Sequence, residues 1–199
     1  MKTKALIITV TIFLFLGSCI PSLFPLYFEK DLITNSDLIG TWNEDGSLNT
    51  WAFYPDEDKK SYNLWFTEKE NNNIDDGREG ILGIFETHLF KLGNYYFFDF
   101  FPGENDELDE KINTLMAFHL VPAHTFAKVE ISKDTIKILQ FDIDYLEELL
   151  ENGKIRIRHV RPDDDIILTA STKELQEFFI KYSEDEDAFN DPIILVKEN

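Results

Sequence analysis

The sequence is poor in cysteine and in basic residues, and both shortages exclude classes of protein. A single cysteine among 199 residues excludes an intramolecular disulfide framework and a cysteine-rich zinc site. Only 19 Lys and Arg accompany 38 Asp and Glu, which gives a formal net charge of −19. Because so acidic a surface repels a phosphate backbone, we expect no nucleic-acid partner.

Aromatic residues, by contrast, are abundant. They make up 14% of the chain and include 18 Phe, within a hydrophobic fraction of 43%. An acidic chain that stays disordered has few aromatic residues, so this one is expected to fold around a core. The length suits one domain.

The first residues have the order of parts found in a signal peptide. Lys2 and Lys4 precede an apolar run from Ala5 to Leu16, which is shorter than the roughly 20 residues that a spanning helix needs. The run ends in Leu16-Gly17-Ser18-Cys19, which resembles the lipobox of bacterial lipoproteins. The resemblance implies cleavage between Ser18 and Cys19, removal of residues 1–18, and acylation of Cys19 with chains such as palmitate.

An uncleaved N-terminal anchor is the alternative, since apolar residues continue to Phe28. Pro21 and Pro25 interrupt that continuation and disfavour one long helix. Ile20 is not an acidic retention signal, so the expected location is the bacterial cell envelope, on a membrane and facing the periplasm. We expect residues 19–36 to be a membrane tether and residues 37–199 to form a single β-rich globular domain.

Short segments rich in aromatic and β-branched residues follow one another from Asp37 to Phe141, separated by Gly, Pro, Asn and Asp. This pattern predicts an antiparallel meander. The hairpin across Pro122-Ala123 would place alternate apolar residues of both arms on one face. The expected strands are Leu38–Asn43, Thr50–Tyr54, Ser61–Thr67, Gly80–Phe90, Tyr95–Phe101, Leu115–Val121, His124–Ile131 and Thr135–Phe141.

Two helices are predicted in the last third. Ser171 and Glu174 form a capping box before an amphipathic helix that reaches Tyr182, and Asp144 with Glu147 suggests a second capping box. Gly153 ends that other helix. The remaining expected strands are Ile155–Val160, Ile166–Thr169 and the closing strand Ile193–Val196. The predicted class is mainly β (α+β), a barrel or strongly curved sheet with two packed helices.

Gly40-Thr41-Trp42 resembles the Gly-x-Trp signature on the first strand of lipocalin-like (calycin) barrels. The resemblance implies that Trp42 plugs the closed end of a barrel beneath an Arg from a late strand, for which Arg156 and Arg158 are candidates. The second motif of that family, Thr-Asp-Tyr, is absent. The alternative is that Trp42 is an ordinary core aromatic.

The segment Tyr95-Tyr96-Phe97-Phe98-Asp99-Phe100-Phe101 is apolar on both faces. A strand buried on both sides explains it. The functional alternative is an aromatic-lined ligand pocket, for which the candidate residues are Trp42, Tyr95, Phe97 and Asp99.

Other candidate sites rest on weaker patterns. Arg156, Arg158 and Arg161 could bind an external anion or pair with the protein's own acids. His119 and His124 would share a face of the predicted hairpin and are weak candidates for metal ligands. The acidic clusters are expected to be solvated loops. We predict no metal and no cofactor.

No catalytic motif was found, so we do not expect an enzyme. The leading hypothesis is a lipid-anchored, non-catalytic envelope lipoprotein that binds an apolar small molecule or a protein partner. The alternatives are a structural or accessory envelope protein without a small ligand and, third, a hydrolase-type enzyme.

Overall fold

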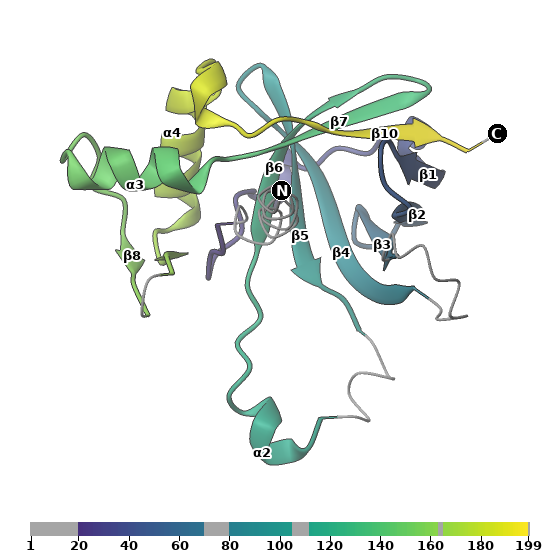
Figure 1. Cartoon of the computed structure of the whole chain (residues 1–199), viewed down its shortest axis with the longest axis horizontal. Helices are drawn as coiled ribbons and strands as arrows, with labels where there is room; N and C mark the ends of the chain where they lie inside the picture. The colour runs from purple at the N-terminus through teal and green to yellow at the C-terminus, as the bar shows by residue number, and fades with distance from the viewer. Residues whose placement is uncertain (1–19, 70–79, 105–111, 163–164, 199) are drawn as a thin grey trace, which may run out of the picture.

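The computed structural model describes residues 20–69, 80–104, 112–162 and 165–198. Eight antiparallel strands form a closed barrel in the order β1-β10-β7-β6-β5-β4-β3-β2 (Figure 1). The predicted mainly-β class is confirmed, and of the two architectures considered the closed barrel is the one observed. Within the described residues no helix is long and apolar enough to cross a membrane.

The strands follow the aromatic and β-branched segments of the sequence closely. Consecutive strands pair as neighbours, except that β10 closes the barrel between β1 and β7. The eight strands are β1 Gly40–Glu44, β2 Thr50–Asp56, β3 Ser61–Glu68, β4 Ile81–Leu92, β5 Tyr95–Pro102, β6 Thr125–Ile131, β7 Thr135–Gln140 and β10 Ile193–Lys197.

The barrel interior is filled by large apolar side chains. Trp42, Phe53 and Phe98 are fully buried there, and Phe53 stacks on Phe98 with ring centroids 5.6 Å apart. The short 3-10 helix η2, Ser36–Leu38, covers the Trp42 end with the buried Leu38. The rest of this cluster consists of Tyr62, Leu64, Leu89, Ala127, Val129, Ile136, Ile138 and Leu195.

A second apolar core lies outside the barrel, between the outer faces of β4 to β6 and two helices. Helix α3, Ile143–Glu151, and helix α4, Thr172–Tyr182, lie beside the barrel in Figure 1. Phe97 of β5 contacts Phe179 of α4 edge-on, at 6.2 Å between ring centroids. This two-sided burial of β5 explains why its sequence is apolar on both faces. The smaller elements here are β8 His159–Val160, β9 Ile167–Leu168 and η3 Glu186–Ala188.

Helix boundaries mostly follow their capping signals. Ser171 and Glu174 form the predicted capping box of α4, and Gly153 follows α3 with a positive φ of 63°. The start of α3 differs from the prediction: its N-cap is Asp142, whose carboxylate accepts a hydrogen bond from the Tyr145 amide. Asp144 lies inside the first turn, where an acid also favours the helix dipole.

The chain before η2 differs from the expected tether. Ile20, Ser22 and Leu26 are buried, and Leu32 forms a β-bridge to Phe90 on the outer wall of β4. The 3-10 helix η1, Glu29–Asp31, lies between these contacts. Residues 20–36 are therefore part of the folded domain rather than a free spacer, because their apolar side chains complete the outer core.

The predicted strand Leu115–Val121 is wrong. The segment begins with the single-turn helix α2, Thr114–Ala117, and β5 pairs directly with β6. The predicted hairpin partner of this segment is β6, and β5 and β7 already occupy both edges of β6. The apolar alternation from Met116 to Leu120 therefore has no strand to pair with. The predicted strands Ile155–Val160 and Ile166–Thr169 are shortened to β8 and β9.

Candidate functional site: a groove outside the barrel and the buried cluster beside it

The closed end of the barrel holds a tryptophan beneath a cation. Lys197 Nζ lies 4.9 Å from the Trp42 ring centroid and donates a hydrogen bond of 2.7 Å to the Asp37 carbonyl oxygen. Trp42 Nε1 donates to the Leu38 carbonyl at 2.8 Å. Gly40 has a φ of +123°, and a Cβ there would contact the Lys197 side chain at 3.5 Å. The cation comes from the last strand, so neither Arg156 nor Arg158 has the expected place.

The four residues of the predicted ligand pocket do not come together. Trp42 faces the filled barrel interior, whereas Phe97 belongs to the outer core. Tyr95 packs against that outer core beneath Lys128 Nζ, which lies 5.4 Å from its ring centroid. Asp99 is fully buried and bonded to other protein groups.

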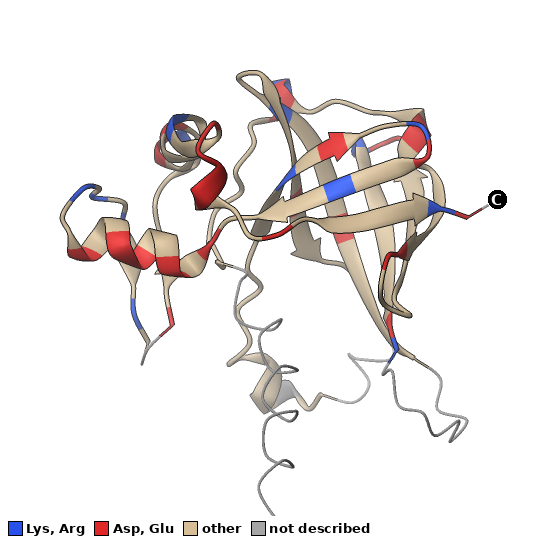
Figure 2. Ribbon diagram, turned by 45° about the horizontal axis from the view of Figure 1, so that its top comes forward, with Lys and Arg blue, Asp and Glu red and all other residues tan. Residues whose placement is uncertain are grey.

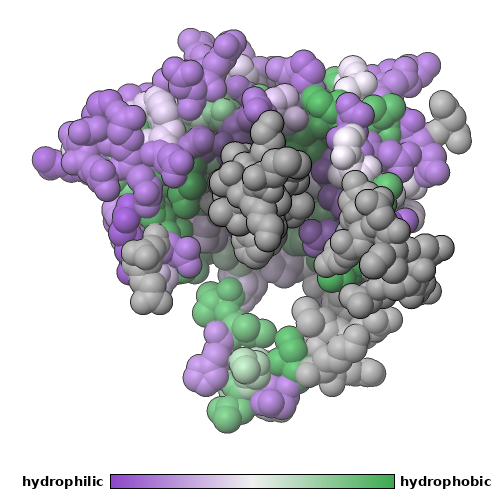
Figure 3. Space-filling model, in the orientation of Figure 1, coloured by the Kyte–Doolittle hydropathy of each residue, from purple (hydrophilic) through white to green (hydrophobic). Residues whose placement is uncertain are grey.

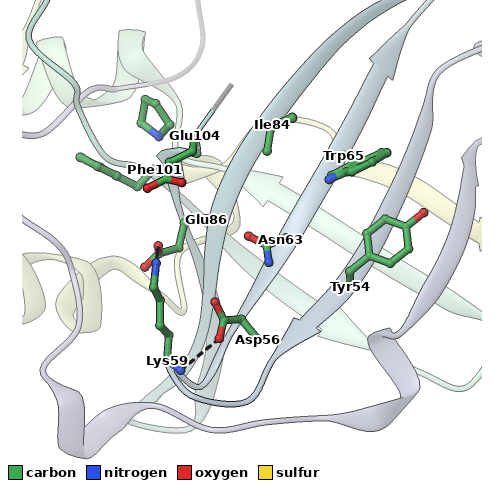
Figure 4. A pocket seen from close by; sticks show the side chains of 11 residues that line it. Tyr54, Asp56, Lys59, Asn63, Trp65, Ile84, Glu86, Phe101 and Glu104 are labelled. Atoms are coloured by element: carbon green, nitrogen blue, oxygen red, sulfur yellow. Dashed lines mark hydrogen bonds and ion pairs between the residues drawn. The ribbon is translucent and has the colours of Figure 1, made fainter. Parts of the chain in front are cut away.

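A groove of about 800 Å³ lies instead on the outer face of β2 to β5. One row of paired residues crosses its floor, because Tyr54 pairs with Asn63, Asn63 with Glu86, and Glu86 with Phe101. Alternation along the strands directs these side chains away from the barrel core. Figure 4 shows the lining residues: Tyr54, Asp56, Lys59, Asn63, Trp65, Ile84, Glu86, Phe101, Pro102, Gly103 and Glu104.

The groove combines exposed aromatic rings with carboxylates. Tyr54 and Trp65 are 47% and 45% exposed and meet edge-on at 5.3 Å between centroids. Across the groove, Lys59 Nζ donates to Glu86 Oε2 at 2.8 Å, and this hydrogen bond raises the pKa of Lys59. Asp56 and Glu104 bring further negative charge to the same groove. Flat rings beside carboxylates suit a ligand that is both apolar and cationic.

A buried polar cluster adjoins the groove behind Phe101, whose ring centroid lies 4.5 Å from that of His124. Asp99 Oδ1 and His124 Nδ1 lie 2.7 Å apart, and the Leu26 amide donates to Asp99 Oδ2 at 2.9 Å. Burial raises the pKa of Asp99, while its hydrogen bonds to His124 and Leu26 act in the opposite direction. One carboxylate thus holds the N-terminal segment and the start of β6 against β5.

His88 and Tyr27 extend this cluster. Their rings stack with centroids 4.4 Å apart, and Tyr27 Oη lies 3.4 Å from His88 Nε2. Burial lowers the pKa of His88, and this effect outweighs Glu86, whose Oε1 lies 3.5 Å away and favours the charged form. Burial together with nearby carboxylates raises the pKa of Tyr27. Both groups are therefore neutral near pH 7.

The arginine cluster pairs mainly with the protein's own acids. Arg158 bonds to Glu174 of α4, and Arg161 Nη2 lies 3.0 Å from Glu147 of α3. Arg156 is exposed. The pairing groups lie on α3 and α4, the two helices next to β8.

The two histidines considered as metal ligands have different surroundings. His119 is exposed after α2, while His124 lies against Asp99 and Phe101. Among residues 20–69, 80–104, 112–162 and 165–198, no three His, Cys, Asp or Glu side chains are placed to hold a metal ion. Ser18 and Cys19, the predicted cleavage and lipidation residues, lie outside the described residues.

Sequence reasoning found parts of the outer site but not their association. Asp99 and His124 were each singled out, and the pairing of Asp99 with Phe126 in adjacent strands brings His124 near. The groove was missed because its residues come from four strands and only the register aligns them. Comparisons of the chain with protein-family models, curated proteins and solved structures found no match.

Proposed function

We propose that this chain is a lipid-anchored protein of the bacterial cell envelope, and that its lipocalin-like barrel is a scaffold for binding a protein partner in the outer groove. The anchor rests on the lipobox residues Leu16 to Cys19. Barrel strand order and the Gly40-x-Trp42 start support the likeness to lipocalins. The activity proposed is non-catalytic binding.

One observation carries the binding site: the barrel interior is filled, whereas the groove outside is open. Trp42, Phe53, Tyr62, Phe98 and Leu64 each have at most 2% of their surface exposed, so an apolar ligand would have to displace packed side chains. Tyr54 and Trp65 already present exposed rings. Aromatic anchors of this kind dominate the energetics of protein interfaces.

The chemistry of the groove favours a partner segment with basic and apolar side chains. Asp56 and Glu104 offer carboxylates, and Glu86 is shared with Lys59. The excess of acids over the whole chain, 38 against 19 Lys and Arg, would also speed the encounter with a basic partner. The Lys59–Glu86 pair at the rim contributes to specificity more than to affinity.

Native mass spectrometry of the protein purified from its own cells tests the proposal. We expect a second polypeptide to be retained by the wild type and lost from Trp65→Ala. Tyr96→Ala is the matched control, since Tyr96 is an exposed aromatic of β5 outside the groove. A partner retained equally by Trp65→Ala, or a small molecule as the only bound species, would reject the groove as the binding site.

A further inference from the structure

We propose that the apolar segment 112–121, which carries α2, inserts into the interface of the same membrane that holds the lipid on Cys19. The proposal rests on the proposed lipid anchor and goes beyond it. It gives the barrel a second, protein-mediated contact with the bilayer and therefore a defined orientation on the membrane surface.

The composition of this segment is unusual for the chain. Residues 112–124 contain no Asp, Glu, Lys or Arg, although these four make up 29% of the whole sequence. In Figure 2 the ribbon of α2, below the barrel, shows neither red nor blue, whereas acidic residues mark α3 and the barrel. The exposed side chains are Leu115 at 71%, Met116 at 53%, Phe118 at 80%, Leu120 at 54% and Val121 at 71%.

These side chains project away from the rest of the molecule. Figure 1 shows α2 at the end of a long connection below the barrel, and Figure 3 shows its apolar atoms as an outlying green group. Contiguous apolar surface of this kind marks a protein or membrane contact. Burial of such side chains in the headgroup and acyl boundary is the basis of interfacial membrane binding.

The first described residues lie at the base of the connection that leads to this segment. Ser22 forms a β-bridge with His124, at the end of the connection from α2. Ile20 is 5% exposed and packs in the outer core, and consecutive Cα atoms are only about 3.8 Å apart. An acylated Cys19 would therefore leave no free spacer between the lipid and the folded domain.

Asp99 joins the segment around Leu26 to the base of the α2 connection. Its carboxylate accepts from the Leu26 amide and bonds to His124, so it holds the chain start and the base of the α2 connection to the same strand. Leu23 and Phe24, 42% and 47% exposed, add apolar surface directly after Ser22. A membrane that receives the acyl chains of Cys19 would meet these residues and the α2 segment from one side.

Electrostatics favour a bilayer over a partner protein as the occupant. The acidic domain is repelled by anionic headgroups, and segment 112–124 adds no Asp or Glu to that repulsion. It contains no Asp, Glu, Lys or Arg that could pair with charged groups of a protein partner. Its last residue, His124, pairs with Ser22, three residues after Cys19, so a bilayer that holds a lipid on Cys19 would lie close to the base of this segment.

The test uses the chain from residue 19 onward, which contains every described residue. Its only cysteine, Cys19, is coupled to a maleimide-headgroup lipid in phosphatidylcholine vesicles, or to a soluble maleimide in the control. Hydrogen exchange of residues 112–121 is then followed by mass spectrometry. We expect slower exchange on vesicles only, with no change in the β1–β2 turn at residues 45–49.

Two variants test whether protection by vesicles depends on the apolar side chains of residues 112–121. Leu115→Asp with Phe118→Asp should abolish the protection by vesicles, and Leu48→Asp, at a 52% exposed apolar residue of the β1–β2 turn, should leave it intact. Equal exchange of residues 112–121 in both coupled forms would overturn the proposal. Protection that rises with protein concentration in the soluble form would also overturn it, in favour of a second copy.

The outcome is independent of the proposed anchor. Because Cys19 is coupled chemically, vesicle protection tests the α2 segment whether or not cells acylate that residue. Acylation is measured separately on protein from its own cells. A chain that is not acylated in cells but is protected on vesicles would reject the proposed anchor and support the α2 contact. A chain that is acylated in cells but is not protected on vesicles would support the anchor and reject the α2 contact.

Discussion

Ser22 and His124 exchange both of their backbone hydrogen bonds, each 2.8 Å long. Because Ser22 is fully buried at this bridge, the segment that precedes the barrel is part of the fold. It joins the outer core, which the two helices cover from the other side. The chain is therefore packed against the barrel from its first described residue, Ile20.

Leu26→Ala should destabilise the domain strongly. Leu26 is fully buried in the outer core, and truncation of a buried leucine costs about 2–5 kcal/mol. Phe24→Ala, at a 47% exposed residue two positions away, is the control and should change stability little. The free energy of unfolding from urea titration checks this; an unchanged midpoint for Leu26→Ala would mean that residues 20–28 are not part of the cooperative unit.

Asp99→Ala should also destabilise the domain, because it removes a buried hydrogen-bond acceptor. It leaves the Leu26 amide and His124 without their acceptor, and each buried unsatisfied group costs about 1–3 kcal/mol. Asp99→Asn keeps one acceptor oxygen and should lose less. The measurement is urea unfolding combined with hydrogen exchange at the Leu26 amide; fast exchange is expected in the alanine variant, and unaltered exchange there would contradict the role given to Asp99.

The stability of the domain should fall as pH drops below about 6.5, in part because of His88. Burial lowers its pKa in the folded state below the ordinary histidine value of 6.5. The unfolded state therefore takes up the proton first, and the contribution of neutral His88, present above pH 6.5, is lost as pH falls. Between pH 7.5 and 5.5, His88→Gln should lose less stability than wild type. His119→Gln, at an exposed residue, is the control and should lose as much stability as wild type. Equal losses in all three would refute the assignment.

Lys197→Ala should weaken the closed end of the barrel. It removes the cation over Trp42 and the donor to the Asp37 carbonyl, together worth about 1–2 kcal/mol. Lys197→Arg retains a cation and should recover part of this. Trp42 is fully buried, so a red shift of tryptophan emission in the alanine variant would indicate that water reaches the ring. Full stability of Lys197→Ala would show that Lys197 does not seal this end.

The barrel strands could be predicted because each carries a strong local signal. Alternating aromatic and β-branched residues between turn residues locate β2, β3 and β5 within two residues of their observed ends. The segment Leu115–Val121 has the same alternation, yet it cannot pair with its predicted partner β6, because β5 and β7 already occupy both edges of that strand. Pairing partners are long-range information, which a local pattern does not contain.

Predicting the outer site from the sequence would have required the same long-range information. The apolar residues Ile20 and Leu26 resemble in sequence a continuation of the predicted leader, and only the outer core of β4 to β6 shows why they are buried. Lys197 likewise becomes the partner of Trp42 only when β10 closes the barrel beside β1. The predicted Arg156 and Arg158 were closer to the family pattern in residue type but lie outside the barrel strands.

The proposed acylation of Cys19 is measured most directly by mass spectrometry of the N-terminal peptide of the protein from its own cells. We expect a peptide that begins at Cys19 and carries acyl chains, found in the membrane fraction. Cys19→Ala should abolish this acylated peptide and release the protein from the membrane. A wild-type peptide that begins at Met1, or one with an unmodified Cys19, would contradict the lipid-anchored envelope protein proposed above.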